Sequence, residues 1–304
     1  CSSDLTETNA LYGTPTLSLV ANGYSGGTLP AVTLSNGGSG LVYTGTFTIP
    51  AGNGTVTATV GATDTAGNTL TATGQTGFTV DNTAPAVVLT YTDNGSANVT
   101  GPYKSGDSVT VTATFTETNA LYGTPTLTLT AGTWTGTGGA TLPAVTLSNG
   151  GSGLAYTGTF TIPAGDGTVT ATVGATDTAG NTLTATGQTG FIIDNTTPTV
   201  VLTYTDNGSS DATGPYKSGD SVTVTATFTE TNALSGTPTL TLVAGTFTGG
   251  TLPTVTLSGS GLVYTGTFTI PAGNGTVTAS VGTVDTAGNT LAATGQTGFT
   301  IDNT

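Results

Sequence analysis

Histidine is absent from the 304-residue sequence, and the single cysteine, Cys1, has no basic side chain near it in the sequence. Nucleophilic catalysis by serine or cysteine needs a neighbouring base to activate the nucleophile. No serine lies at the strand-to-helix turn that exposes a nucleophile in hydrolases. Paired carboxylates, which can cleave glycosides, are the remaining catalytic option. We expect that the protein is not an enzyme.

Basic side chains are almost absent as well. Lys104 and Lys217 stand against 16 acidic residues, and the formal net charge is −14. Because phosphates are neutralised by basic side chains, nucleic acid is excluded as a partner. The same charge disfavours anionic membranes, and the sequence has no run of about 20 apolar residues that could span a bilayer. We therefore expect no direct membrane insertion.

Methionine is absent too, so we expect that residue 1 is not a translation start and that the chain is a processed protein or a piece of a longer one. Cys1, followed by Ser2 and Ser3, looks like the lipid-modified end of a mature bacterial lipoprotein. In the alternative interpretation, Cys1 aligns with Val111 of a later repeat and is an ordinary strand residue. A lone cysteine forms no disulfide framework, so it does not indicate the redox compartment.

Glycine and threonine dominate what is present. The sequence has 48 glycines and 35% hydrophobic residues, and roughly a quarter of all positions are threonine, a β-branched residue that favours strands. This composition allows a hydrophobic core and many turns. It predicts an all-β protein without helices.

Internal repeats organise the whole chain. The segment TETNAL recurs at Thr6, Thr116 and Thr229, and DTAGNTL recurs at Asp64, Asp177 and Asp285. The blocks YTGTFTIPAG and GQTGF also occur three times, whereas GPYKSGDSVTVTATF occurs twice. We predict an incomplete repeat at 1–82 and two full repeats at 83–195 and 196–304.

Alternation of apolar residues with threonine or serine predicts seven half-buried strands in the second repeat. They are expected at 86–92, 108–116, 124–130, 143–148, 154–162, 168–176 and 183–193, and we call them A to G. Seven short strands in roughly 110 residues are typical of an immunoglobulin-like sandwich. The predicted fold is therefore all-β: tandem immunoglobulin-like seven-strand β-sandwiches in a linear array.

The motifs together resemble a known family. The segments DNTAP at Asp81, GPYKSGDSV, the block from Tyr156 and DTAGN at Asp177 are similar to the bacterial immunoglobulin-like repeats of large surface adhesins and biofilm-associated proteins. The resemblance implies an extracellular location at the bacterial cell surface. It also implies calcium at the interdomain junctions, because related adhesin repeats, like cadherins, bind calcium there.

The acidic residues are expected to converge at one pole of each sandwich. Strands A, C, E and G run away from the pole where the linker arrives, so the B–C and F–G loops return to that same pole. Oxygen donors without nitrogen or sulfur select a hard cation with six to eight ligands, and we predict Ca²⁺. The first junction would use Asp81, Asn82, Glu117, Asn119, Asp177 and Asn181, and the second Asp194, Asn195, Glu230, Asn232, Asp285 and Asn289.

Two alternatives accompany the calcium hypothesis. Asp and Asn residues also cap tight turns, which DTAGN-like loops commonly require. A second cluster of Asp93, Asn94 and Asp107 lies at the opposite pole, where we favour turn formation over metal binding. Lys104 and Lys217 are interpreted as surface charges rather than as partners in isopeptide bonds. The threonine runs are interpreted as ordinary strand faces rather than as an ice-binding surface.

The two ends of the sequence match each other. The first repeat begins inside its predicted strand B, and its cage would use Glu7 and Asp64, without a preceding linker. The chain ends with a linker that contains Asp302. We favour the interpretation that the sequence is a segment of a longer array of repeats. The partners of these repeats would then be further repeats of the same chain. The alternative is head-to-tail assembly of copies, which generates filaments.

The leading functional hypothesis is a non-catalytic stalk or filament segment, stiffened by calcium, that supports adhesion or biofilm structure. The alternative is a binding module whose loops, such as 131–142, recognise surface glycans or a partner. Recognition loops should vary between repeats, and these repeats match even in most loops. Trp134, which aligns with Tyr24 and Phe247, is expected to plug the end of the sandwich. Sequons at Asn53, Asn94, Asn98, Asn195, Asn207 and Asn274 allow glycosylation.

Overall fold

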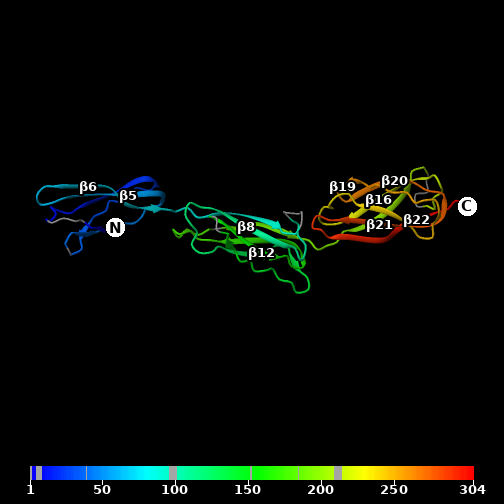
Figure 1. Cartoon of the computed structure of the whole chain (residues 1–304), viewed down its shortest axis with the longest axis horizontal. Coiled ribbons are helices and arrows are strands. Elements are labelled where there is room, and N and C mark those ends of the chain that lie inside the picture. The colour runs from blue at the N-terminus through cyan, green and yellow to red at the C-terminus, as the bar shows by residue number, and fades with distance from the viewer. Residues whose placement is uncertain are drawn as a thin grey trace. The chain divides into compact units, whose positions relative to one another are not determined.

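The structure is a computed structural model that describes residues 2–4, 9–38, 40–95, 101–150, 153–183, 185–208 and 214–304. Cys1 and Glu7, and the sequon at Asn98, lie outside these residues. The described residues form strands and turns and contain no α-helix (Figure 1). Among them, no helix has the length and hydropathy to cross a membrane.

Contacts group the chain into two compact units. Unit 1 comprises Cys1–Ala86, Phe115–Pro125 and Gly174–Thr184, and unit 2 comprises Val87–Thr114, Thr126–Val173 and Ala185–Thr304. Most of the strands of the second and third repeats therefore belong to unit 2.

The second repeat contains two antiparallel sheets. The first sheet has the order β11-β12-β8-β7, and in the second β13 lies between β14 and the pair β9 and β10. The strands are β7 (Ala86–Asp93), β8 (Ser108–Thr116), β9 (Thr126–Ala131), β10 (Thr135–Gly136), β11 (Ser148–Asn149), β12 (Ala155–Thr161), β13 (Gly165–Gly174) and β14 (Ala185–Ile193). With strands A, B, E and D in one sheet and C, F and G in the other, this is the immunoglobulin-like arrangement.

The third repeat has the same topology. One sheet has the order β15-β16-β20-β19, and the other joins β17, β18 and β22 to β21. The strands are β15 (Thr199–Asp206), β16 (Ser221–Thr229), β17 (Thr239–Ala244), β18 (Thr248–Gly249), β19 (Ser258–Ser260), β20 (Val263–Thr269), β21 (Gly273–Val284) and β22 (Thr290–Ile301). The described part of the chain therefore contains this sandwich twice.

The first repeat shows a smaller version of both sheets, with the orders β1-β4-β3 and β2-β5-β6. The strands are β1 (Ser2–Asp4), β2 (Thr16–Gly26), β3 (Ser35–Asn36), β4 (Val42–Thr44), β5 (Gly52–Thr63) and β6 (Thr69–Val80). β1 pairs with β4 as β8 pairs with β12 in the second repeat, so it corresponds to the end of strand B.

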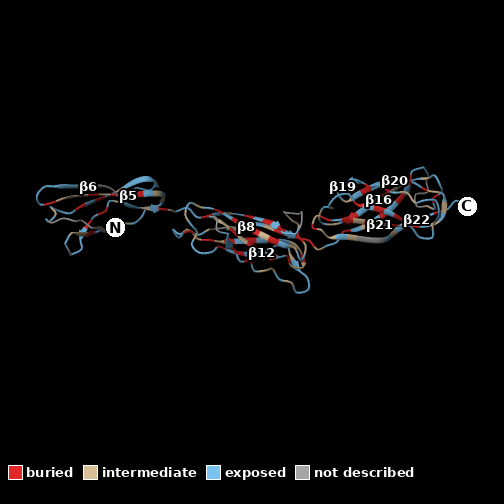
Figure 2. Ribbon diagram, viewed as in Figure 1, coloured by how far each residue is buried: buried red, intermediate tan, exposed pale blue. Residues whose placement is uncertain are grey.

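The alternating sequence explains why these strands bury one face. In β8, the side chains of Val109, Val111 and Ala113 are fully buried, whereas the intervening threonines lie on the outer face. Figure 2 shows buried positions along β8 between less buried ones. Successive side chains of a strand point to opposite sides of the sheet. In the third repeat, one buried cluster joins Val224 of the first sheet to Phe299 of the second. The predicted all-β sandwich fold is confirmed.

Three details differ from the predicted strands. Strand D, expected at 143–148, is reduced to the two residues of β11 and a bridge between Leu127 and Val145. β10 was not predicted. The backbone around Tyr103 forms a parallel bridge to Ile193, so part of the predicted A–B loop lies beside the end of strand G. These pairings are too short to give a periodic sequence signal.

Candidate metal centre

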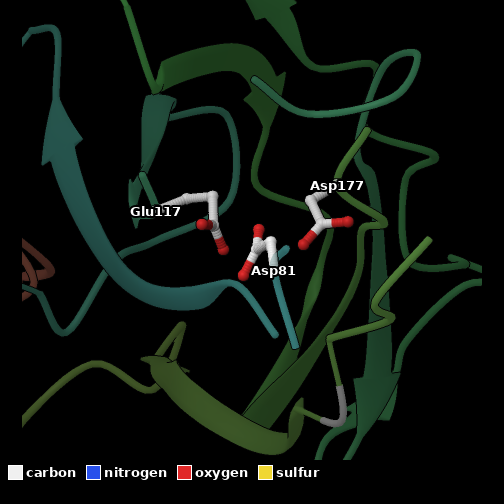
Figure 3. Close-up of side chains that lie close together, drawn as sticks. All are labelled: Asp81, Glu117 and Asp177. Carbon is white, nitrogen blue, oxygen red and sulfur yellow. The ribbon is translucent and has the colours of Figure 1, made fainter. Parts of the chain in front are cut away.

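Three carboxylates from separate segments meet at the first junction. Asp81, Glu117 and Asp177 each offer an oxygen that lies within 4.8 Å of the others, and their side chains point toward one another (Figure 3). Asp81 follows β6, Glu117 follows β8, and Asp177 lies in the loop between β13 and β14. All three belong to unit 1. The structure thus brings together the linker, the B–C loop and the F–G loop, as strand connectivity predicts.

Asp177 is fixed by its own loop. Its Oδ1 accepts hydrogen bonds from the backbone N–H groups of Ala179, at 2.8 Å, and Asn181, at 2.9 Å. The Asn181 side-chain amide donates to Asp177 Oδ2 at 2.9 Å and to the Asp81 carbonyl at 3.0 Å. Burial acts to raise the pKa of Asp177, but these hydrogen bonds outweigh it and lower the pKa. The buried group is therefore held as a carboxylate.

One carboxylate oxygen of Glu117 accepts hydrogen bonds from the turn that follows it, and the other oxygen has no partner. Its Oε1 accepts from the backbone N–H groups of Thr118, at 2.6 Å, and Asn119, at 3.3 Å. Its Oε2 is buried without a hydrogen-bond partner. An unsatisfied buried carboxylate oxygen is costly, and a cation at the centre of the three carboxylates would satisfy it.

The second junction repeats this arrangement within unit 2. Asp194, Glu230 and Asp285 also place one oxygen each within 4.8 Å of the others. The Asn232 amide donates to Asp194 Oδ2 at 2.6 Å, as Asn119 donates to Asp81 Oδ2 at 2.5 Å. Glu230 Oε2 is again buried without a partner. The glutamate Oε2 lacks a partner at both junctions, so this is a recurring feature of the repeat.

The asparagines that were predicted as ligands have two different positions. Asn119 and Asn181, like Asn232 and Asn289, contact the carboxylates and direct their amide N–H groups at oxygens of the centre. In this orientation they hold the carboxylates in place. A half-turn of the amide would present the oxygen to a cation instead.

Asn82 and Asn195 do not lie with the carboxylates, in contrast to the prediction. The Asn82 amide donates to the Gly52 carbonyl, and its backbone N–H donates to Asn53 Oδ1 at 2.7 Å. Asn195 makes the matching bonds to Gly165 and Asp166. The physical reason is that adjacent residues of an extended linker point in opposite directions. Each linker therefore uses Asp toward the following repeat and Asn toward the preceding one.

The remaining predicted residues belong to the first repeat and to the end of the third repeat. Asp64 accepts from the backbone and side chain of Asn68, both at 2.7 Å, and these bonds lower its pKa. This is the same turn as that of Asp177. Glu7 lies outside the described residues. Asp302 accepts from Thr304, which lowers its pKa, and within the described residues it belongs to no group of three acidic side chains.

The donor set fits a hard cation. The acidic residues of each centre supply carboxylate oxygens only, and no histidine or cysteine that would suit zinc or copper belongs to either group. Close carboxylates otherwise repel one another or take up protons. The arrangement is suited to binding a divalent ion between a linker and a domain.

The second acidic cluster serves turns. Asp93 Oδ1 accepts from the Gly95 N–H at 2.9 Å, and Asp107 Oδ2 accepts from the Lys104 N–H at 2.8 Å. Burial, followed by the nearby charge of Asp93, raises the pKa of Asp107 against the backbone hydrogen bond. The described residues contain no group of three metal-binding side chains here.

Trp134 is packed against the backbone rather than displayed. A Cβ added to Gly136 or Gly165 would come within 2.8 Å of its indole ring, so glycine is required beneath it. Tyr24 and Phe247 lie over the matching glycines of the other repeats. These contacts agree with an aromatic plug.

The fold defines an immunoglobulin-like β-sandwich protein. Residues 112–195 match the family model of the bacterial Ig-like domain, which covers most of the second repeat. This match confirms the resemblance of that repeat to bacterial Ig-like domains, and the closely similar sequences of its neighbours indicate the same fold. No curated protein matches the chain.

Among solved structures, the chain is similar to SGBP-B of the Bacteroides ovatus mixed-linkage glucan utilization locus, which was solved in complex with a mixed-linkage heptasaccharide. The identity is 14% and the TM-score is 0.19, over 99% of this chain and 64% of that chain. The chain thus spans less than two thirds of the length of that protein.

Proposed function

We propose that the chain is a non-catalytic structural protein of the bacterial cell surface, in which calcium at each junction fixes the linker to the following Ig-like repeat. The observation that carries this proposal is the convergence of a linker aspartate with two loop carboxylates, including the unpartnered Glu117 Oε2. The same convergence occurs at Glu230. A stalk or filament segment needs such stiff joints.

The charges explain how calcium would act as a joint. Without a cation, three carboxylates within 4.8 Å of one another repel, and the linker aspartate is the member that can move away. A divalent ion reverses the sign of this interaction. The linker then gains a strong attachment to the domain that follows, while Asn82 or Asn195 keeps its attachment to the domain that precedes.

Two features of the repeats favour a spacer function rather than glycan binding. Trp134, in the loop that differs most between repeats, is turned onto glycines. The other loops repeat almost residue for residue. Ligand sites usually combine aromatic faces with a few placed polar groups, and the side of Trp134 that packs on Gly136 and Gly165 is not available for such a contact.

Calorimetric titration with calcium tests the proposal, together with thermal unfolding in calcium and in chelator. We expect two binding events, one for each complete centre. At a calcium concentration of about 100 times Kd, binding stabilises the folded state by about 2.7 kcal/mol per site, which raises Tm by roughly 10 °C.

The double variant Glu117→Gln and Glu230→Gln separates metal binding from turn formation. Glutamine keeps the Oε1 acceptor that makes the turn but removes one negative charge. Because repulsion is relieved, we expect the variant to equal or exceed the wild type in chelator, yet to lose the calcium-induced rise in Tm. The control Asp93→Asn with Asp206→Asn removes two charges elsewhere and should retain that rise. A calcium response that is equal in both double variants would refute the proposal.

A further inference from the structure

A segment of the second repeat, residues 103–107, lies beside the start of the linker to the third repeat. We call this segment the strut. The Tyr103 carbonyl accepts from the N–H of Asp194 at 2.8 Å, and the Ser105 N–H donates to Asn195 Oδ1 at 2.7 Å. The strut is thus bound to the linker at two points.

Lys104, between these two points, reaches a loop of the third repeat. Its Nζ donates to the Gly288 carbonyl at 2.8 Å. Gly288 belongs to the DTAGN loop, residues 285–289, which also carries the metal-site residue Asp285. A Cβ on Gly288 would lie 3.0 Å from the same Nζ, so the close approach depends on glycine. Both residues of this contact belong to unit 2.

The loop is buried where it meets the strut. Ala287 has only 7% of its surface exposed, and it lines one pocket together with Gly288, Lys104 and Gly106. Ala179, at the matching position of the DTAGN loop of the second repeat, is exposed. The burial of Ala287 therefore comes from its contact with the second repeat and not from the conformation of its own loop.

The backbone of the strut is fixed by its own repeat. In the third repeat, the Tyr216 carbonyl accepts from the Asp302 N–H at 2.9 Å, and the Ser218 N–H donates to Asn303 Oδ1 at 2.6 Å. These bonds match those of the strut, yet Lys217 is exposed. The half-burial of Lys104 is therefore caused by the loop of the third repeat, which the lysine meets from a preformed backbone.

We propose that Lys104 is a cation-independent latch that holds the second and third repeats in one orientation by binding the Gly288 carbonyl. Domains joined by a linker and a small interface move relative to each other by default. A charge-assisted hydrogen bond is roughly twice as strong as a neutral one, and here it connects the linker-bound strut directly to the following repeat. The latch goes beyond the proposed calcium function and does not depend on it, because the contact needs no metal ion.

Pulsed electron paramagnetic resonance of the full chain in chelator tests the latch. Spin labels are placed at Ser148→Cys in β11 and Ser258→Cys in β19, both exposed, and Cys1→Ser removes the native thiol. We expect one narrow distance distribution between the labels. Lys104→Met keeps the length of the side chain but removes the charged donor, and it should abolish the narrow peak and leave a broad distribution.

Hydrogen exchange of the loop at 285–289 gives a second measurement in the same buffer. Exchange requires local opening, and the loss of a charge-assisted hydrogen bond should speed it about tenfold in Lys104→Met. The loop at 177–181, which Lys104 does not contact, is the internal reference and should exchange at an unchanged rate.

Lys217→Met is the matched control, because it makes the same change in an exposed lysine of the third repeat. It should leave both the distance distribution and the exchange of the 285–289 loop as in the wild type. The proposal is overturned if the distance distribution of Lys104→Met equals that of the wild type, or if Lys217→Met broadens it equally. Since every measurement is made in chelator, either result would leave the calcium proposal intact.

Discussion

At each linker, an aspartate contacts the following repeat and the adjacent asparagine contacts the preceding repeat. Asp194 faces the following repeat, where it accepts from Asn232, and Asn195 faces the preceding one, where it contacts Gly165 and Asp166. An Asp-Asn pair is suited to this because both side chains are short and because neighbours in an extended chain alternate in direction. The pairing of Asn195 with Asp166, and of Asn82 with Asn53, was not predicted, because the partners lie 29 positions apart and share no sequence pattern.

The buried hydroxyl of Tyr204 should make the stability of the fold depend on pH in the alkaline range. Its hydroxyl donates to the Thr297 carbonyl at 3.1 Å across the sandwich, and burial raises its pKa to about 12, with a further contribution from Tyr216. The folded-state pKa lies above the unfolded value of about 10, so this stabilisation is complete below pH 10. We expect it to be lost as the pH rises from about 10 to 12. Tyr103, whose pKa burial also raises to about 12, should act in the same direction.

Urea denaturation at increasing pH, with tyrosinate absorbance recorded in parallel, measures this loss. The variant Tyr204→Phe should lower stability at neutral pH by about 1 kcal/mol, because one hydrogen bond is removed. It should also show a smaller decrease of stability between pH 10 and 12 than the wild type. An identical alkaline decrease in both proteins would show that Tyr204 contributes nothing to it.

Strands were predicted better than the irregularities within them. Six of the seven strands of the second repeat lie where alternation placed them, because β8 and its neighbours bury one continuous face. The register shift between β13 and β14, after the Val169–Phe191 pair, could not be predicted. It places Gly190 so close to the Val169 carbonyl that a Cβ would overlap it. The recurring GQTGF motif thus encodes a bulge.

The substitution Gly190→Ala tests the role of this bulge in the stability of the second repeat. The added Cβ would meet backbone rather than a flexible side chain, so the bulge must open or the strands must separate. We expect a loss of more than about 2 kcal/mol in the unfolding free energy of the second repeat, measured by urea denaturation. Gly150→Ala is the matched control, because nothing lies within 4 Å of its added Cβ. It should change stability by less than about 0.5 kcal/mol. Equal effects of the two changes would contradict the role of the bulge.

At the scale of the whole molecule, strand topology was enough to predict which acidic residues of the candidate site lie together. Strand direction alone assigns Asp81, Glu117 and Asp177 to one pole, and the structure brings their oxygens within 4.8 Å of one another. The contact of Lys104 with Gly288 was missed, because it depends on a parallel pairing of the segment around Tyr103 that leaves no periodic pattern. Contacts made by long, flexible side chains across repeats are not encoded by spacing.

Linker attachment should be measurable as resistance to proteolysis. The linker from Asp194 to Pro198 is held on one side by Asn195 and on the other by Asp194. Cleavage requires local release, so Asn195→Ala should raise the rate of cutting there by about tenfold, the equivalent of one to two hydrogen bonds. The measurement uses a protease of broad specificity with mass spectrometry, since lysine occurs only at Lys104 and Lys217.

The matched control for this experiment is Asn303→Ala. Asn303 makes the same bonds, to Gly273 and Asn274, at the end of the third repeat, so its loss should leave cutting between Asp194 and Pro198 unchanged. Chelator should accelerate cutting in the wild type if a cation adds to the hold of Asp194, and should add little in Glu230→Gln. If Asn195→Ala and Asn303→Ala are cut at the same rate as the wild type, the asparagine does not hold the linker, and the joint depends on the carboxylate side alone.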